Sequence, residues 1–178
     1  MILIIKICKD SLHDPEFVKP IEDVLKRNNI DFNTVHYREI TEDSFENIDR
    51  IIISGTSLKD NKFLEDLEFF NWIKECKKPI LGICGGMHIL GLMFNGELMK
   101  ISEIGLTDVF IEKKYLEIQG KKQEYDLHNF FVKSDDFEVF GTSKSCAQAT
   151  KHKQKPFYGV LFHPEVRSKD LIVNFTKL

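Results

Sequence analysis

The chain has 178 residues, of which 42% are hydrophobic and 30% are charged, a composition typical of a folded globular protein. A chain of this length can bury most of its apolar surface, so we expect one domain spanning residues 1–178. Its formal net charge of −3 gives no reason to expect binding to nucleic acid or to an anionic membrane.

The ends and the cysteines of the chain also bear on its location. The apolar opening, residues 1–5, is too short for a signal peptide, and no window is long enough to span a membrane. Cys8, Cys76, Cys84 and Cys146 show neither the spacing of metal ligands nor a small disulfide framework. The sequence therefore predicts a reducing, cytoplasmic location, with no metal and no cofactor.

The first half of the chain alternates predicted strands with predicted helices. Apolar, β-branched segments typical of buried strands lie at residues 1–8, 32–37, 48–54 and 80–83. Segments with helical spacing of apolar residues lie at residues 20–28, 63–76 and 87–94. The order β-α-β-β-α-β-α predicts an α/β domain with a mainly parallel central sheet flanked by helices.

After residue 94 the pattern changes to short alternating or aromatic-rich segments. They lie at residues 96–100, 106–113, 115–119, 125–133, 137–142 and 146–151. Such segments favour antiparallel strands and hairpins, so we expect a small antiparallel β insertion. An apolar core strand at residues 157–162 and a closing helix at residues 169–178 are predicted to complete the domain.

Cys84 stands between the predicted strand 80–83 and the predicted helix 87–94. This strand–turn–helix order is that of a nucleophile elbow, with cysteine in place of serine. Glycines at positions 82, 85 and 86 allow a sharp turn and leave the amide after Cys84 free to point at an oxyanion. The positive end of the following helix would favour the thiolate. A buried structural cysteine would give the same pattern, so the assignment as nucleophile requires a base elsewhere.

His163 is the best candidate for that base. It directly follows the predicted core strand 157–162, and catalytic groups of open α/β sheets lie beyond the carboxyl ends of strands. His152, by contrast, lies in a lysine-rich run that we expect to be a solvated loop. Glu165, two residues after His163 on an extended path, could orient the imidazole and stabilise its protonated form. Cys84, His163 and Glu165 are therefore predicted to form a catalytic triad.

The motifs PILGICGGMHIL and FYGVLFHPEV resemble the triad-type class I glutamine amidotransferases, and the resemblance covers nearly the whole chain. It implies a flavodoxin-like glutaminase architecture and glutamine as the small-molecule substrate. Cys84 would attack the side-chain amide to form a γ-glutamyl thioester, His163 would protonate the departing ammonia and then activate water, and Glu165 would hold His163. The oxyanion hole would consist of the Gly85 amide and a second amide, from Thr56 or Gly55, in the turn after the preceding strand.

Substrate recognition departs from the family pattern. The family usually has glutamine four residues after the nucleophile, where this chain has His88. The segment that binds the amino-acid end of glutamine is expected at His128, Asn129 and Phe130, with Asn129 where serine is common. His88 could bond the substrate or could simply pack beside Cys84.

Three functions remain open from the sequence. The resemblance favours a glutaminase that supplies ammonia to a separate synthetase subunit, since no second domain is present to use the ammonia. The run 151–160 is most similar to the GMP synthase branch, which we favour, whereas residues 128–130 are closer to the anthranilate or aminodeoxychorismate synthase branch. The alternatives are a stand-alone γ-glutamyl amide or peptide hydrolase, and a non-catalytic glutamine-binding regulatory domain.

Overall fold

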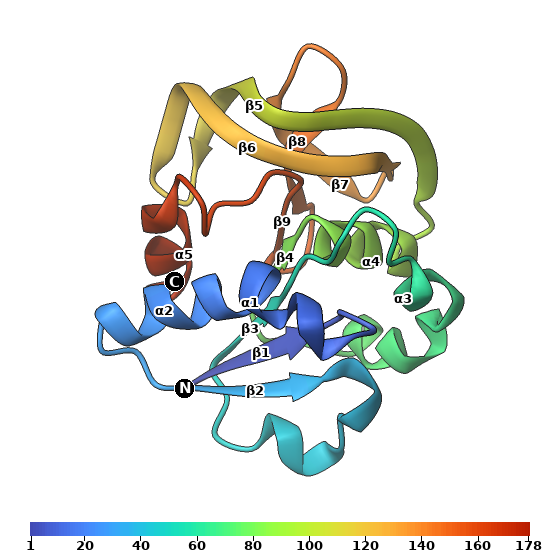
Figure 1. Ribbon diagram of the computed structural model, residues 1–178, viewed down its shortest axis with the longest axis vertical. Helices are drawn as coiled ribbons and strands as arrows, with labels where there is room; N and C mark the ends of the chain where they lie inside the picture. Colours follow the sequence, from blue (N-terminus) through green and yellow to red (C-terminus); the bar gives the residue numbers. More distant parts are fainter.

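The computed structural model describes residues 1–178, and its strands form one nine-stranded sheet. The strand order is β2-β1-β3-β4-β9-β8-β7-β5-β6. The strands are β1 (Ile2–Lys6), β2 (Phe32–His36), β3 (Arg50–Ile53), β4 (Ile80–Ile83), β5 (Glu97–Tyr115), β6 (Ile118–Lys133), β7 (Phe137–Thr142), β8 (Ala147–His152) and β9 (Phe157–Val160). Figure 1 shows β5 and β6 as a long ribbon that lies across one end of the molecule.

The sheet is mixed, which corrects the expectation of a mainly parallel sheet with a small antiparallel insertion. Strands β2, β1, β3, β4 and β9 pair in parallel, whereas β9, β8, β7, β5 and β6 pair antiparallel. The antiparallel strands continue the same sheet because β8 pairs directly with the core strand β9. The short predicted segments after residue 94 join into strands of 19 and 16 residues, β5 and β6, with irregular register between Lys100 and Glu103 and between Ile111 and Tyr115.

Helices cover both faces of the parallel half of the sheet. The α-helices are α1 (Asp14–Phe17), α2 (Lys19–Arg27), α3 (Lys62–Glu65), α4 (Gly85–Met93) and α5 (Lys169–Phe175). The 3₁₀ helices are η1 (Ser11–His13), η2 (Tyr37–Glu39), η3 (Glu42–Phe45) and η4 (Leu67–Lys74), so the predicted helix 63–76 is divided into α3 and η4. No helix is both long enough and apolar enough to cross a membrane.

The alternation of side chains along β1 explains this two-sided cover. Ile2 and Ile4 pack with α2 and α5 in one apolar cluster. Leu3 and Ile5 point the other way and pack with α4 and η4 in a second cluster. Because both faces of β1 are buried, its sequence is almost continuously apolar, which is why it could be recognised as an interior strand.

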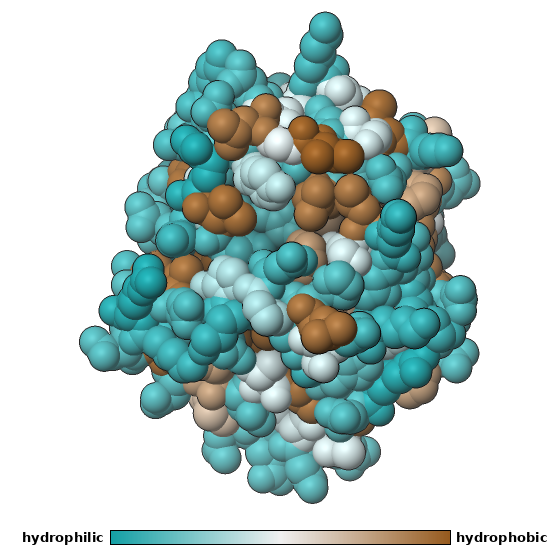
Figure 2. Space-filling model, in the orientation of Figure 1, coloured by the Kyte–Doolittle hydropathy of each residue, from teal (hydrophilic) through white to brown (hydrophobic).

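The ribbon of β5 and β6 has one buried and one exposed face. On β5, Val109 and Ile111 are buried, while Ile104, Leu106 and Phe110 are more than half exposed. Figure 2 shows apolar atoms gathered in the upper half of the molecule, where Figure 1 draws this ribbon. On β6 the buried face contains polar residues instead, namely Glu124, Asp126 and His128. Buried polar groups need hydrogen-bonding or ionic partners, so the inner side of this ribbon must supply partners for these three side chains.

Candidate active site

Three loops converge at the carboxyl ends of adjacent parallel strands. Strand β4 pairs with β3 on one side and with β9 on the other. Cys84 directly follows β4, Gly55 lies two residues after β3, and His163 lies three residues after β9. Parallel pairing therefore brings these three positions to one edge of the sheet, as expected for a site in an open α/β fold.

Cys84 forms a strained elbow. Its φ of 48° and ψ of −103° lie in a region that residues other than glycine rarely adopt, at a cost of about 1–3 kcal/mol. The neighbouring glycines permit the close approach of α4 to the sheet. A Cβ on Gly82 would lie 2.5 Å from the Gly86 carbonyl carbon, and a Cβ on Gly86 would lie 2.4 Å from the Ile53 carbonyl oxygen. The packing of helix on strand thus holds Cys84 at the first turn of α4.

His163 and Glu165 form a buried pair. Nδ1 of His163 lies 2.7 Å from Oε1 of Glu165, and both side chains are at most 2% exposed. Nε2 of His163 has no hydrogen-bond partner, so a tautomer that donates from Nδ1 to Glu165 leaves Nε2 free to accept a proton. The His163 backbone amide donates to the Tyr125 carbonyl, and the Phe17 ring lies 5.6 Å from the imidazole.

The electrostatics of this pair favour a protonated imidazole. Burial lowers the pKa of His163, but the negative charges of Glu165 and of a Cys84 thiolate outweigh this effect and raise the pKa well above its ordinary value. Burial raises the pKa of Cys8 to about 11 and of Cys146 to about 12. Those two thiols are therefore protonated near neutral pH.

A small pocket opens beside Cys84. It is lined by Thr56, Ser57, Leu58, Asp60, Asn61, Phe63, Cys84, Gly85, His88, Leu127, His128, Asn129 and Phe130. Thus Gly85, Thr56 and all four residues expected to contact substrate line the same pocket as the candidate nucleophile. Gly55 does not line it and lies instead against His163.

The turn after β3 has a defined orientation. The Gly55 carbonyl accepts hydrogen bonds from Ser54 Oγ at 3.0 Å and from Cys8 Sγ at 3.7 Å. In a trans peptide the following N–H points opposite to the carbonyl, so the Thr56 amide points away from Cys8. Thr56 Oγ1 donates to Asp60 at 2.8 Å, which fixes the turn. Sequence reasoning missed Asp60 because its role depends on the path of the loop.

The pocket wall formed by β6 uses backbone atoms. Cys84 Sγ donates to the Leu127 carbonyl at 3.6 Å, and His88 Nε2 lies 3.0 Å from the Phe130 carbonyl oxygen. Burial lowers the pKa of His88 to about 4, so its imidazole is neutral at physiological pH. Leu127 was also missed from the sequence, since a backbone carbonyl has no sequence signature.

The two remaining predicted contacts point in different directions. The His128 imidazole is completely buried, with Nε2 3.3 Å from Glu103 and 3.5 Å from Asp126. Asn129 Oδ1 accepts a hydrogen bond from Ser102 at 3.0 Å.

His152 is buried among Phe94, Phe137 and Phe157, which corrects the expectation that it lies in a solvated loop.

Comparison with known proteins defines the class to which this fold and site belong. The family model for class-I glutamine amidotransferases matches residues 12–175. The chain therefore belongs to the class-I glutamine amidotransferase family.

Several individual relatives are named as GMP synthase subunits. The chain is 33% identical over 159 residues to the glutamine-hydrolysing GMP synthase subunit of Methanocaldococcus jannaschii, covering 82% of this chain and 81% of the relative. It is 32% identical to the corresponding subunit of Pyrococcus abyssi, covering 72% and 74%. The crystal structure of a GMP synthase subunit from Thermoplasma acidophilum matches with a TM-score of 0.85 and 25% identity, over 99% of this chain and 93% of the other.

Proposed function

We propose that this protein is the glutaminase subunit of a two-subunit GMP synthase, hydrolysing glutamine and supplying ammonia to a separate synthetase subunit. The observation that carries the proposal is the buried pair of His163 and Glu165 beside the elbow cysteine Cys84. Its support comes from similarity to the two GMP synthase subunits, which extends over most of both chains in each case. The unit that performs the reaction is the whole domain, residues 1–178.

Cys84 acts as the nucleophile of the reaction. Its proton passes to Nε2 of His163, and its sulfur attacks the side-chain amide carbon of glutamine. As the tetrahedral intermediate collapses, the C–N bond breaks, and His163 returns the proton to the leaving ammonia. The product at this stage is a γ-glutamyl thioester on Cys84.

Hydrolysis of the thioester uses the same residues. His163 takes a proton from water, the resulting hydroxide attacks the thioester carbon, and the C–S bond breaks to release glutamate and the Cys84 thiolate. Glu165 accepts the Nδ1 proton in a hydrogen bond and stabilises the imidazolium without becoming protonated itself.

The oxyanion hole combines two amides. Gly85 is the first residue of α4, where the N–H has no partner within the helix and the helix dipole is positive. We assign the second donor to Thr56 rather than to Gly55, because Thr56 lines the pocket and its N–H points opposite to the engaged Gly55 carbonyl. Donors of this kind each contribute about 3–4 kcal/mol of transition-state stabilisation.

The remaining pocket residues have different roles in binding the substrate. Asn129 and Phe130 lie on the β6 wall that faces Cys84, and they hold the amino-acid end of glutamine. His88 donates from Nε2 to the Phe130 carbonyl and so positions that wall. His128 has its imidazole turned to the buried side of β6, so its contribution to the pocket comes from its backbone.

The test measures ammonia and GMP together. Glutamine hydrolysis is assayed alone and with the synthetase subunit of a GMP synthase, together with that subunit's nucleotide substrates. We expect stimulated hydrolysis and glutamine-dependent GMP formation, both lost in Cys84→Ala but with GMP still formed from added ammonia. Hydrolysis of γ-glutamyl amides or peptides that is fast and indifferent to the synthetase would overturn the proposal in favour of a stand-alone hydrolase.

A further inference from the structure

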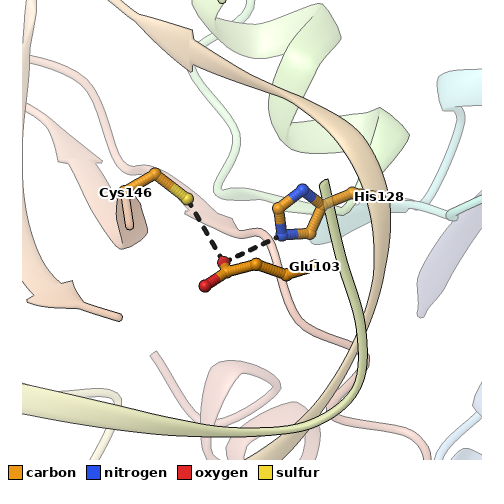
Figure 3. A group of neighbouring side chains, drawn as sticks. All are labelled: Glu103, His128 and Cys146. Atoms are coloured by element: carbon orange, nitrogen blue, oxygen red, sulfur yellow. Dashed lines mark hydrogen bonds and ion pairs between the residues drawn. The ribbon is translucent and has the colours of Figure 1, made fainter. Parts of the chain in front are cut away.

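The inner side of the β5–β6 ribbon holds a second cluster of chemically active side chains, separate from the triad. Glu103 comes from β5, His128 from β6 and Cys146 from the residue that precedes β8. Figure 3 shows the Glu103 carboxylate between the Cys146 sulfur and the His128 imidazole. Glu103 and Cys146 are 43 positions apart in the chain, but their side chains are in contact in the interior.

Two of the three distances between the ligand atoms are those of a metal site. Glu103 Oε2 lies 3.3 Å from His128 Nε2 and 3.5 Å from Cys146 Sγ, and the three atoms all lie within 4.8 Å of one another. In a tetrahedral zinc site with bonds of about 2.0–2.3 Å, neighbouring ligand atoms are about 3.3–3.8 Å apart. Carboxylate, imidazole and thiolate are also the three ligand types that zinc prefers.

His128 and its neighbour Asp126 lack the hydrogen bonds that burial requires. Neither ring nitrogen of His128 has a hydrogen-bond partner, although the side chain is completely buried. Both carboxylate oxygens of Asp126, which is also completely buried, are likewise unpartnered. His128 Nε2 lies near the carboxylates of Glu103 and Asp126, but neither contact has the geometry of a hydrogen bond. Buried polar atoms without partners are rare, and a bound cation is one recognised explanation for them.

A second layer already holds the carboxylate in place. Gln148 Nε2 donates to Glu103 Oε2 at 2.8 Å, and Ser143 Oγ donates to the same oxygen at 3.1 Å. Ligands of metal sites are oriented by hydrogen bonds of this kind.

We propose that Glu103, His128 and Cys146 bind a structural divalent cation of the zinc class. The cation ties β5 and β6 to the turn before β8. Its ligand His128 lies between Leu127 and Phe130, whose carbonyls contact Cys84 and His88. The cation therefore steadies the β6 wall of the pocket without touching substrate. This metal site does not depend on the glutaminase assignment.

The first test measures binding in the full chain. The protein is stripped with EDTA, equilibrated with zinc, desalted and analysed for zinc by mass spectrometry. We expect about one zinc per chain in the wild type and in the control Cys76→Ser, whose cysteine is not near the cluster. Cys146→Ser and Glu103→Gln should lose the zinc, and Gln148→Ala should weaken its affinity about 10–100-fold. A wild type that holds no stoichiometric zinc would overturn the proposal.

Cobalt identifies the ligands and separates this site from the triad, which also contains a cysteine and a histidine. Cobalt bound to Cys146 should give a thiolate-to-metal charge-transfer absorption that persists in Cys84→Ala and disappears in Cys146→Ser. The reverse pattern would assign the metal to the nucleophile and overturn the proposal. Circular dichroism checks that each variant folds, and the wild-type and Cys84→Ala spectra decide the question even where Cys146→Ser does not fold.

Discussion

Gly55 lies against His163 so closely that any side chain at position 55 would displace the imidazole. A Cβ atom on Gly55 would lie 2.8 Å from Cε1 of His163 and 3.4 Å from Cβ of Cys84. The hydrogen bond to Glu165 fixes His163 from the other side, at 2.7 Å. The turn after β3 therefore controls the distance between the candidate nucleophile and its base.

The substitution Gly55→Ala should reduce turnover with little effect on folding. The added methyl group would push the imidazole away from Cys84, and a misplacement of about 1 Å can cost about 100-fold in rate. Steady-state kinetics should show a lower kcat with a nearly unchanged KM, and circular dichroism should show an intact fold. Wild-type kcat in this variant would show that the contact does not position His163.

Cys84→Ala should abolish ammonia release. The change removes the sulfur that forms the thioester in the proposed mechanism, but it is small enough to leave the elbow folded. Ammonia production from glutamine measures the effect, and mass spectrometry should detect no adduct with a glutamine-analogue electrophile. Cys76→Ala, at a half-buried cysteine away from the pocket, is the matched control and should keep full activity.

Loss of His163 should slow turnover more than loss of the Glu165 charge. In the proposed mechanism His163 transfers the proton, a role worth about 10²–10⁴-fold, whereas Glu165 orients and stabilises the imidazole. We therefore expect a smaller kcat for His163→Ala than for Glu165→Gln in the same assay. Equal losses would contradict this division of roles.

The Glu165–His163 pair should make stability depend on pH in a defined direction. The folded-state pKa of His163 is raised above its unfolded value of about 6.5, so the pair stabilises the fold fully below pH ~6.5. That stabilisation is lost as the pH rises through the folded-state pKa. Urea denaturation should therefore show Glu165→Gln to be more destabilising at pH 6 than at pH 10, and an equal effect at both values would refute the linkage.

The two substitutions of His88 should separate its hydrogen bond from its size. His88→Gln keeps a donor for the Phe130 carbonyl and should retain activity, whereas His88→Ala removes it and should cost about 1–3 kcal/mol of unfolding free energy. The lowered pKa of about 4 adds a pH test. A folded-state pKa below the unfolded value means that stability from His88 falls as the pH drops from ~6.5 towards 4, and this fall should be absent in His88→Gln.

Much of the fold was readable from local pattern. The alternation of strands and helices up to residue 94 and the strand–turn–helix order around Cys84 are confirmed, because apolar periodicity and glycine placement are properties of short segments. That all the strands join into one mixed sheet was not readable. Whether β8 joins β9 or belongs to a separate insertion depends on contacts between distant segments, and this is where the expectation of a mainly parallel sheet was wrong.

The sequence by itself determined that Cys84 and His163 each follow an apolar strand, because burial imposes a visible composition on such segments. Only the tertiary structure decided that β4 and β9 are neighbours, and so that the two residues share one edge of the sheet. The cluster of Glu103, His128 and Cys146 could be found only from the tertiary structure. Spacing rules detect metal ligands that are close in sequence, whereas these three meet only because the long ribbon folds over β8 and turns alternate side chains inward.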